Sequence, residues 1–259
     1  MKLTNKSPIS AANELHSYIG WTTPADFTVE EIANALGIIV KDLPIKGSEG
    51  RVIARGDSGI ISINSGITLT GKRNFIIGHE IAHFLLHQRL MVFFSDTDKT
   101  LSEWHQKGPH EREANNFATE LLMPAELFTK KVTGQRLSIG LIQDVSKFFN
   151  VSLLATFLRY VTYGKFPVMV IYMENKTVKW KQASTDFPFQ WLPLGSAVPV
   201  YTVAGDHFYN NTHEDKPAKV DAIEWFPEDS QIRYKKDWKL WEQCYSVSQT
   251  GLVSCLWTY

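Results

Sequence analysis

Cysteine, net charge and long apolar runs are all scarce in this 259-residue sequence, and each scarcity excludes a class of protein. The two cysteines, Cys244 and Cys255, are too few for a disulfide scaffold and lack zinc-knuckle spacing, so we expect both to be reduced core residues. The 27 Lys and Arg residues balance 27 Asp and Glu residues, which leaves no field to attract nucleic acid or an acidic membrane. No apolar run approaches the roughly 20 residues of a membrane span, and residues 1–8 lack a secretory signal, so a cytoplasmic protein is expected.

The composition of the chain predicts two domains. Hydrophobic residues make up 44% of the sequence, enough for a packed core, and chains above about 250 residues tend to divide. Six of the eight tryptophans and frequent prolines follow Gly164, where segments such as 166–172 and 252–257 have the pattern of strands. We therefore expect residues 1–164 to form one domain, and residues 165–259 to form a β-rich domain for substrate selection or regulation.

The residues before Gly164 combine a small sheet with several helices. Thr28 and Glu31 have the spacing of a capping box, and segments 51–55 and 60–64 flank a turn-rich centre, which indicates a hairpin. Helices are predicted at about residues 71–87, 109–123 and 137–163, the last as a helical hairpin. The expected fold class is α+β: a mainly helical domain with a small mixed sheet, followed by a β-rich C-terminal domain.

The pattern that carries chemistry is H-E-x-x-H at residues 79–83. Residues four apart lie one turn apart on the same helix face, so the imidazoles of His79 and His83 can hold one metal ion. Glu80 is rotated by about 100° from His79 and can approach a metal-bound water without being a ligand. Apolar residues on both sides predict a mostly buried helix, in which coordination would compensate the cost of a polar cluster.

A catalytic zinc site needs a third protein ligand besides two imidazoles. The candidates downstream are His87, His105, His110, Glu111, Glu113 and Glu120. His87 lies about 12 Å along the helix axis from His79, which favours a helix C-terminal cap or a surface group. On the next helix Glu111 is in line with the apolar stripe, whereas Glu113 is expected on the solvated side. Helix geometry thus favours Glu111 over Glu113 as the third ligand and does not decide among the remaining candidates.

Two segments together carry a family likeness: HEIAHFLLH at residues 79–87 is followed about thirty residues later by EREANNFATELLMP at residues 111–124. They closely resemble the ImmA/IrrE family of zinc-dependent endopeptidases, and the likeness extends from Thr28 to about Tyr163 and more loosely beyond. The resemblance implies a zincin-like domain with a gluzincin-like site. In that site His79, His83 and Glu111 would bind one Zn²⁺, which Mn²⁺ or Fe²⁺ could replace, and Glu80 would be the general base.

The same resemblance implies a mechanism and a partner. Zinc would polarise the scissile carbonyl and lower the pKa of its water, while Glu80 passes the water's proton to the leaving amine. Family members are known for cutting DNA-binding repressors, so the implied partner is a protein substrate such as a transcriptional repressor. Related gluzincins often have Asp where this chain has Asn115, whose amide can still hydrogen-bond a ligand histidine with less negative charge. We expect Asn115 to tune the site.

Two details of substrate binding stay open at this point. The oxyanion donor is one of Tyr160, Tyr163, His105 and His110. An upstream strand such as residues 60–64 could bind an extended substrate by strand addition, unless that strand is already paired on both sides.

Two other classes of function compete with the peptidase. Residues 141–152 have the sequence pattern of a helix-turn-helix motif. The helix that follows is apolar, and Arg159 is its only cation. This composition favours a helical hairpin packed on the core over a DNA-binding motif. We therefore expect neither direct nucleic-acid binding nor a membrane partner. The other class is a catalytically silent metal-binding regulator or antitoxin-like protein that acts through its tryptophan-rich C-terminal region. The complete H-E-x-x-H argues against it, because a purely structural site has no use for Glu80.

Overall fold

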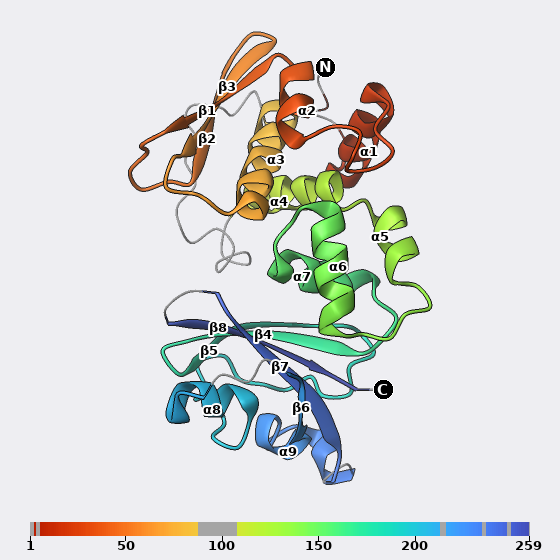
Figure 1. Cartoon of the computed structure of the whole chain (residues 1–259), viewed down its shortest axis with the longest axis vertical. Helices are drawn as coiled ribbons and strands as arrows, with labels where there is room; N and C mark the ends of the chain where they lie inside the picture. The colour runs from red at the N-terminus through yellow and green to blue at the C-terminus, as the bar shows by residue number, and fades with distance from the viewer. Residues whose placement is uncertain are drawn as a thin grey trace. The chain divides into compact units, whose positions relative to one another are not determined.

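The computed structural model describes residues 3, 6–87, 108–212, 216–234, 237–247 and 250–258 (Figure 1). The chain divides into two compact units. The N-terminal unit contains Met1–Lys131 and Ile139–Thr156, and the C-terminal unit contains Val132–Ser138 and Phe157–Tyr259. The division of function at residue 164 stays a prediction. The α+β class is confirmed, because helices accompany a three-stranded mixed sheet in the first unit and a five-stranded antiparallel sheet in the second.

The helices of the N-terminal unit surround the H-E-x-x-H segment. They are α1 (Pro8–Ile19), α2 (Val29–Ala35), α3 (Thr70–Leu86), α4 (Pro109–Leu122), α5 (Ala125–Val132) and α6 (Ile139–Phe149), and α7 (Leu153–Tyr163) continues into the C-terminal unit. The expected capping box is present at the start of α2, where Thr28 accepts from the Glu31 N–H and the Glu31 carboxylate accepts from the Thr28 N–H. The helix expected at about residues 71–87 corresponds to α3, and the one expected at 109–123 corresponds to α4.

The small sheet has the strand order β1-β3-β2. Strand β1 (Ile38–Leu43) runs parallel to β3 (Ser58–Asn64), and β2 (Gly50–Arg55) pairs with β3 in the antiparallel hairpin that the sequence indicates. Because β3 is paired on both sides, residues 60–64 cannot take a further strand, and of the two alternatives that the sequence left open the paired strand is the one observed. Within the described sheet, β2 has a neighbour on one side only.

Helix α3 lies between this sheet and α4, which bury the H-E-x-x-H motif from two sides (Figure 1). Ile77 and Ile81 are fully buried in the same core cluster as Ile61 and Ile63 of β3. On its other side α3 packs against α4, where a Cβ on Gly78 would lie 3.4 Å from the Cβ of Ala118. Small residues at this crossing bring the two helix backbones close together, so polar side chains from both helices reach one point.

The C-terminal unit is built on a sheet with the order β5-β4-β8-β7-β6. Its elements are β4 (Val168–Glu174), β5 (Thr177–Ala183), α8 (Val203–Asn210), β6 (Ala218–Asp221), α9 (Ala222–Trp225), a 3-10 helix η2 (Ser230–Tyr234), β7 (Lys239–Ser246) and β8 (Gly251–Trp257). The buried Glu242 carboxylate accepts from the N–H groups of Val203 and Ala204 at 2.9 and 3.2 Å and so caps α8. Both cysteines are free, as expected, with Cys255 buried and Cys244 half-buried.

In the described part of the chain, no single helix is both long enough and apolar enough to cross a bilayer. Only α6 and α7, taken together as a bent pair, meet the length and composition requirement.

Candidate metal centre

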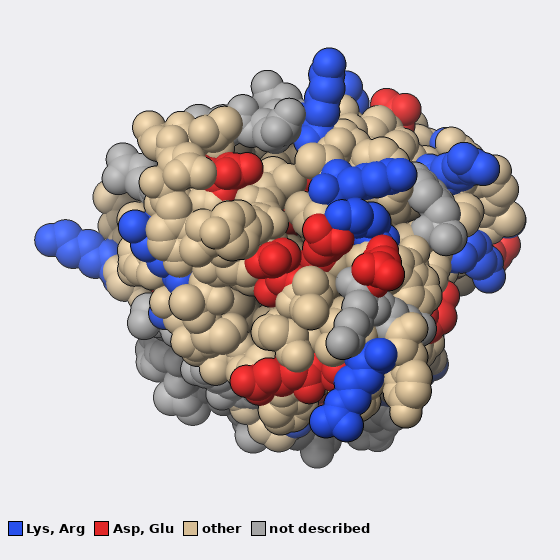
Figure 2. All heavy atoms as spheres, turned by 90° about the horizontal axis from the view of Figure 1, so that it is seen from below, with Lys and Arg blue, Asp and Glu red and all other residues tan. Residues whose placement is uncertain are grey.

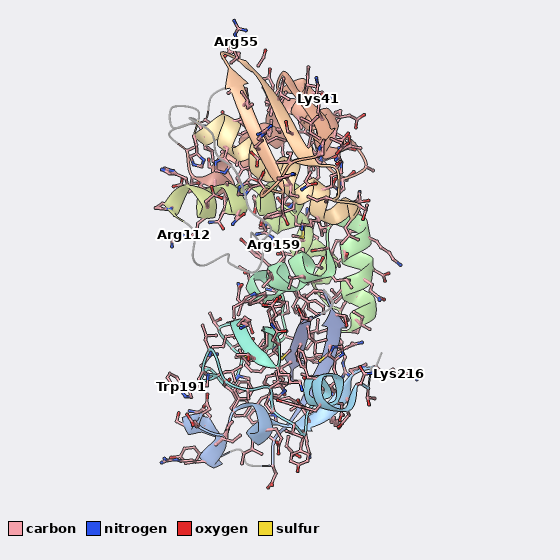
Figure 3. All side chains as sticks on the ribbon, turned by 90° about the vertical axis from the view of Figure 1, so that its left-hand side faces the viewer. Lys41, Arg55, Arg112, Arg159, Trp191 and Lys216 are labelled. Atoms are coloured by element: carbon pink, nitrogen blue, oxygen red, sulfur yellow. The ribbon has the colours of Figure 1, made fainter. Side chains whose placement is uncertain are left out.

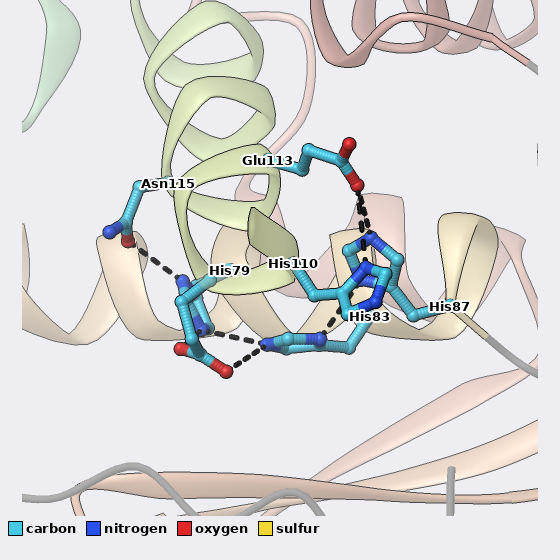
Figure 4. A network of polar contacts seen from close by, with 7 residues as sticks. His79, His83, His87, His110, Glu113 and Asn115 are labelled. Atoms are coloured by element: carbon cyan, nitrogen blue, oxygen red, sulfur yellow. Dashed lines mark hydrogen bonds and ion pairs between the residues drawn. The ribbon is translucent and has the colours of Figure 1, made fainter. Parts of the chain in front are cut away.

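Two imidazoles from α3 meet inside the N-terminal unit. His79 and His83 are each only 1% exposed, and their Nε2 atoms lie 3.0 Å apart (Figure 4). The four-residue spacing places both rings on one face of the helix, as expected from helix geometry. Two ring nitrogens that face each other this closely need either a shared proton or a cation between them.

Glu111 completes this group from the first turn of α4. Its Oε2 lies 3.3 Å from His79 Nε2, and its Oε1 lies 3.4 Å from His83 Nε2. One ligand atom from each of His79, His83 and Glu111 lies within 4.8 Å of the other two, close enough for one metal ion to contact all three. The residues present therefore fit a divalent metal ion held by two imidazoles and one carboxylate.

The side chain of Glu80 lies in the same buried region, and it is 1% exposed. It is close to the first residue of β2, because a Cβ built on Gly50 would lie 3.3 Å from Glu80 Oε1 and 2.4 Å from Ile76 Cγ2. Only a residue without a side chain fits between the strand and the helix at this point. Gly50 was not singled out from the sequence, because a glycine at the start of a strand carries no signal of the helix it will face.

Asn115 lies one turn after Glu111 on α4 and contacts the first histidine. Its Oδ1 is 2.9 Å from His79 Nδ1 (Figure 4). An amide oxygen can only accept, so the His79 Nδ1–H donates and the lone pair of the ring is on Nε2, the atom that faces Glu111. Asn115 thus holds His79 in the tautomer that a metal ion requires.

His87 and Glu113 contact each other, which helix geometry did not predict. His87 caps α3, the first of its two expected roles, and at 4% exposed it is not also a surface group. The side chain of Glu113 is 47% exposed, as expected for the solvated side, and its Oε2 lies 2.9 Å from His87 Nε2. The contact was not predicted because helix geometry considers each helix separately, whereas α4 covers the end of α3 and brings the two side chains together. The recurrence of histidine every four residues, at positions 79, 83 and 87, was the sequence feature that could have indicated that His87 lies on the same buried face as His79 and His83.

Burial acts on the titratable groups of this region. Desolvation lowers the pKa of His83 and of His87 below the ordinary value for histidine. The hydrogen bond from His87 lowers the pKa of the Glu113 carboxyl group, because it favours the ionised form. The lowered pKa favours the neutral form of His83 and His87, which is the form of imidazole that binds metal ions.

Comparison with known proteins decides the family. Residues 33–159 match the family model of the IrrE N-terminal-like domain, peptidase family M78. This part of the chain belongs to the ImmA/IrrE peptidase family. It contains α3 and α4 and hence His79, His83 and Glu111, the candidate metal-binding group.

Comparison of structures extends the similarity of fold beyond the matched ImmA/IrrE domain. A Mycobacterium tuberculosis transcriptional regulator has a TM-score of 0.61 with 15% sequence identity, and the alignment covers 96% of this chain and 74% of the regulator. At this identity the likeness shows a shared fold. A search of curated proteins found no significant match.

His110 is the candidate oxyanion donor that the described part of the N-terminal unit places near the candidate metal-binding group. His110 precedes Glu111 on α4, and its ring centroid is 4.8 Å from that of His87. His105 is outside the described residues, and Tyr160 and Tyr163 belong to the C-terminal unit. The oxyanion donor is therefore not assigned.

Proposed function

We propose that the chain is a zinc-dependent endopeptidase that cuts a regulatory protein, such as a DNA-binding repressor, at a specific site. In this proposal His79, His83 and Glu111 bind the metal ion and Glu80 is the general base. The observation that supports it best is the convergence of two buried imidazoles and a carboxylate, with ligand atoms within 4.8 Å of one another, inside a peptidase-family domain. Mn²⁺ or Fe²⁺ could take the place of Zn²⁺, because these ligands do not select one metal.

The buried carboxylate of Glu80 has the central role in proton transfer. A bound divalent ion would polarise the scissile carbonyl and lower the pKa of a water molecule. Glu80 would then take the proton of the attacking water on a carboxylate oxygen and deliver it to the nitrogen of the leaving amine. Its position next to a ligand histidine in the sequence, but about 100° away around the helix, allows this role without coordination.

Strand β2 is the element that we propose to bind an extended substrate. Its first residue, Gly50, lies beside Glu80, and within the described sheet β2 is paired on one side only. A peptide that adds to the free edge of β2 would form main-chain hydrogen bonds along it. The scissile bond would then come close to Glu80, whereas the central strand β3 offers no free edge.

Replacing Gly50 with Ala is expected to lower kcat/KM for peptide cleavage about 10- to 100-fold, because the added Cβ would collide with Ile76 and shift Glu80 from its position. The zinc content should not change. Cleavage assays and metal analysis on the same preparation check this. Gly66→Ala is the matched control, because the nearest atom to its Cβ is Asn64 Oδ1 at an ordinary contact distance of 3.4 Å. Equal activity of the two variants would argue against placing the substrate along β2.

Residues 165–259 are proposed to select the substrate rather than to take part in the chemistry. Trp191 is 58% exposed in the C-terminal unit, and Figure 3 shows it at the surface. The backbone that carries it is held in place, because the N–H groups of Gln190 and Trp191 donate to Asp229 Oδ2 at 2.8 and 2.7 Å. A large aromatic side chain that is exposed on a rigid segment has the properties of an interface anchor.

Replacing Trp191 with Ala is therefore expected to slow cleavage of the natural protein partner about 5- to 30-fold. Cleavage of a short peptide that spans the scissile bond should stay the same, because such a peptide lacks the surface of the protein partner that Trp191 is proposed to recognise. Comparison of kcat/KM for the two substrates measures the effect, with the exposed Tyr234→Ala as control. A parallel loss for protein and peptide would contradict a role in selection.

The proposed function is tested by incubating the zinc-loaded protein with candidate helix-turn-helix repressors, with and without a chelator. We expect one new N-terminus in one repressor, detected by mass spectrometry, which the chelator abolishes. A stable complex without cleavage would instead favour the silent regulatory protein. Salt-dependent binding to random duplex DNA would favour a DNA-binding regulator, although Figure 2 shows basic and acidic side chains close together on the face in view. A repressor substrate would be met in the cytoplasm, the location that we propose.

A further inference from the structure

Three histidines follow one another along α3, and each contacts the next. His79 and His83 meet through their Nε2 atoms, and His83 and His87 meet through their Nδ1 atoms at 3.1 Å (Figure 4). The far nitrogen of His87, Nε2, contacts Glu113 Oε2 at 2.9 Å. A continuous line of polar contacts therefore runs from the metal-binding group to a carboxylate on α4 that is not part of it.

The direction of each hydrogen bond in this line follows from its last acceptor. An ionised carboxylate only accepts, so the proton between Glu113 and His87 is on His87 Nε2. A neutral imidazole carries one N–H, which leaves His87 Nδ1 as an acceptor. The proton of the next contact must then be on His83 Nδ1. His83 Nε2 is consequently left with a lone pair, and this is the atom that faces His79 and Glu111.

We infer that His87 and Glu113 are positioning residues that hold His83 in its metal-binding tautomer and transmit the negative charge of Glu113 to the metal site. The inference rests on the proposed metal site. It assigns different hydrogen-bond partners to the two ligand histidines. The amide oxygen of Asn115 accepts from His79, and His87, which itself donates to Glu113, accepts from His83. An amide supplies no charge, so the carboxylate of Glu113 provides what Asn115 lacks.

A second metal ion is the competing interpretation, because ligand atoms of His87, His110 and Glu113 also lie within 4.8 Å of one another. An ion on His87 Nε2 would move the proton of that ring to Nδ1. His83 Nδ1 would then have to accept, and the proton of His83 would lie on Nε2, the atom needed by the first ion. The two sites therefore exclude each other, and the first is favoured because its imidazoles are buried while the side chain of His110 is 46% exposed.

The test measures the Zn²⁺ dissociation constant of the full chain and the absorption spectrum of its Co²⁺ form. Glu113→Ala and His87→Phe should each weaken Zn²⁺ binding about 10- to 100-fold and change the Co²⁺ spectrum. His87→Asn should recover most of the affinity, because Asn Oδ1 takes the place of Nδ1 and accepts from His83. Circular dichroism of the metal-free variants should match the parent chain, which separates positioning of His83 from a general loss of structure.

A double variant makes the inference specific. If Glu113 acts through His87, adding Glu113→Ala to His87→Phe should cause no further loss of Zn²⁺ affinity. His110→Ala is the control, and it should keep both the affinity and a stoichiometry of one ion per chain. Unchanged affinity in Glu113→Ala and His87→Phe overturns the inference, as does a second Zn²⁺ ion that His110→Ala removes. Failure of the parent chain to bind Zn²⁺ at all would reject the proposed function, which is a different result.

Discussion

Replacing Glu80 with Gln is expected to abolish peptide cleavage while the metal content and the fold stay nearly unchanged. The amide keeps the size of the carboxylate in a position that is 1% exposed, so the packing around it is retained. It cannot take a proton from water, and general base catalysis contributes about 10²- to 10⁴-fold to a rate. We therefore expect kcat/KM to fall by about three orders of magnitude, measured on a fluorogenic peptide with zinc analysis of the same sample.

The control for this experiment is a second buried glutamate in the same unit. Glu120 on α4 is buried, and its Oε1 accepts from the Ala125 N–H at 3.0 Å, a bond that Gln can also form. Glu120→Gln should therefore keep full cleavage. Cleavage that persists in zinc-loaded Glu80→Gln protein would reject the proposed hydrolytic mechanism, whatever the result for Glu120→Gln.

Removal of one metal ligand is expected to remove both the metal and the activity. His79→Ala and Glu111→Gln each leave two protein ligands where a catalytic zinc site usually has three, so zinc content should fall from about one ion per chain to near zero after dialysis. Plasma mass spectrometry measures the zinc, and cleavage assays measure the activity. This loss differs from that of Glu80→Gln, in which activity disappears and the zinc remains.

Glu113→Gln is the matched control for Glu111→Gln, because both residues lie in the first turns of α4. We expect it to keep its zinc, with lower affinity, since the Gln oxygen can still accept from His87. If Glu111→Gln retains full zinc occupancy while Glu113→Gln loses it, Glu111 is the wrong third ligand. Restoring activity to His79→Ala by excess Zn²⁺ would show that His79 contributes affinity only.

Features that depend on local geometry could be predicted from the sequence. The four-residue spacing of His79 and His83 determines that both imidazoles lie on one face of α3. The capping box of Thr28 and Glu31 involves residues only three apart, and it forms as expected. Glu111 follows the apolar stripe of its own helix, which was sufficient to separate it from Glu113 as a candidate ligand. Each of these inferences depends only on residues within a single helix or at its N-terminal cap.

Features that depend on which elements meet were decided by the tertiary structure. Both β2 and β3 have the pattern of strands, but only the pairing of β3 with β1 makes β3 central and leaves β2 at the edge. His87 has the same spacing whether it is solvated or covered, and it is buried because α4, with Glu113 26 residues away, packs across the end of α3. Helical periodicity determines which face of a helix a residue occupies. What covers that face depends on long-range packing, here the close crossing of α3 and α4 at Gly78 and Ala118.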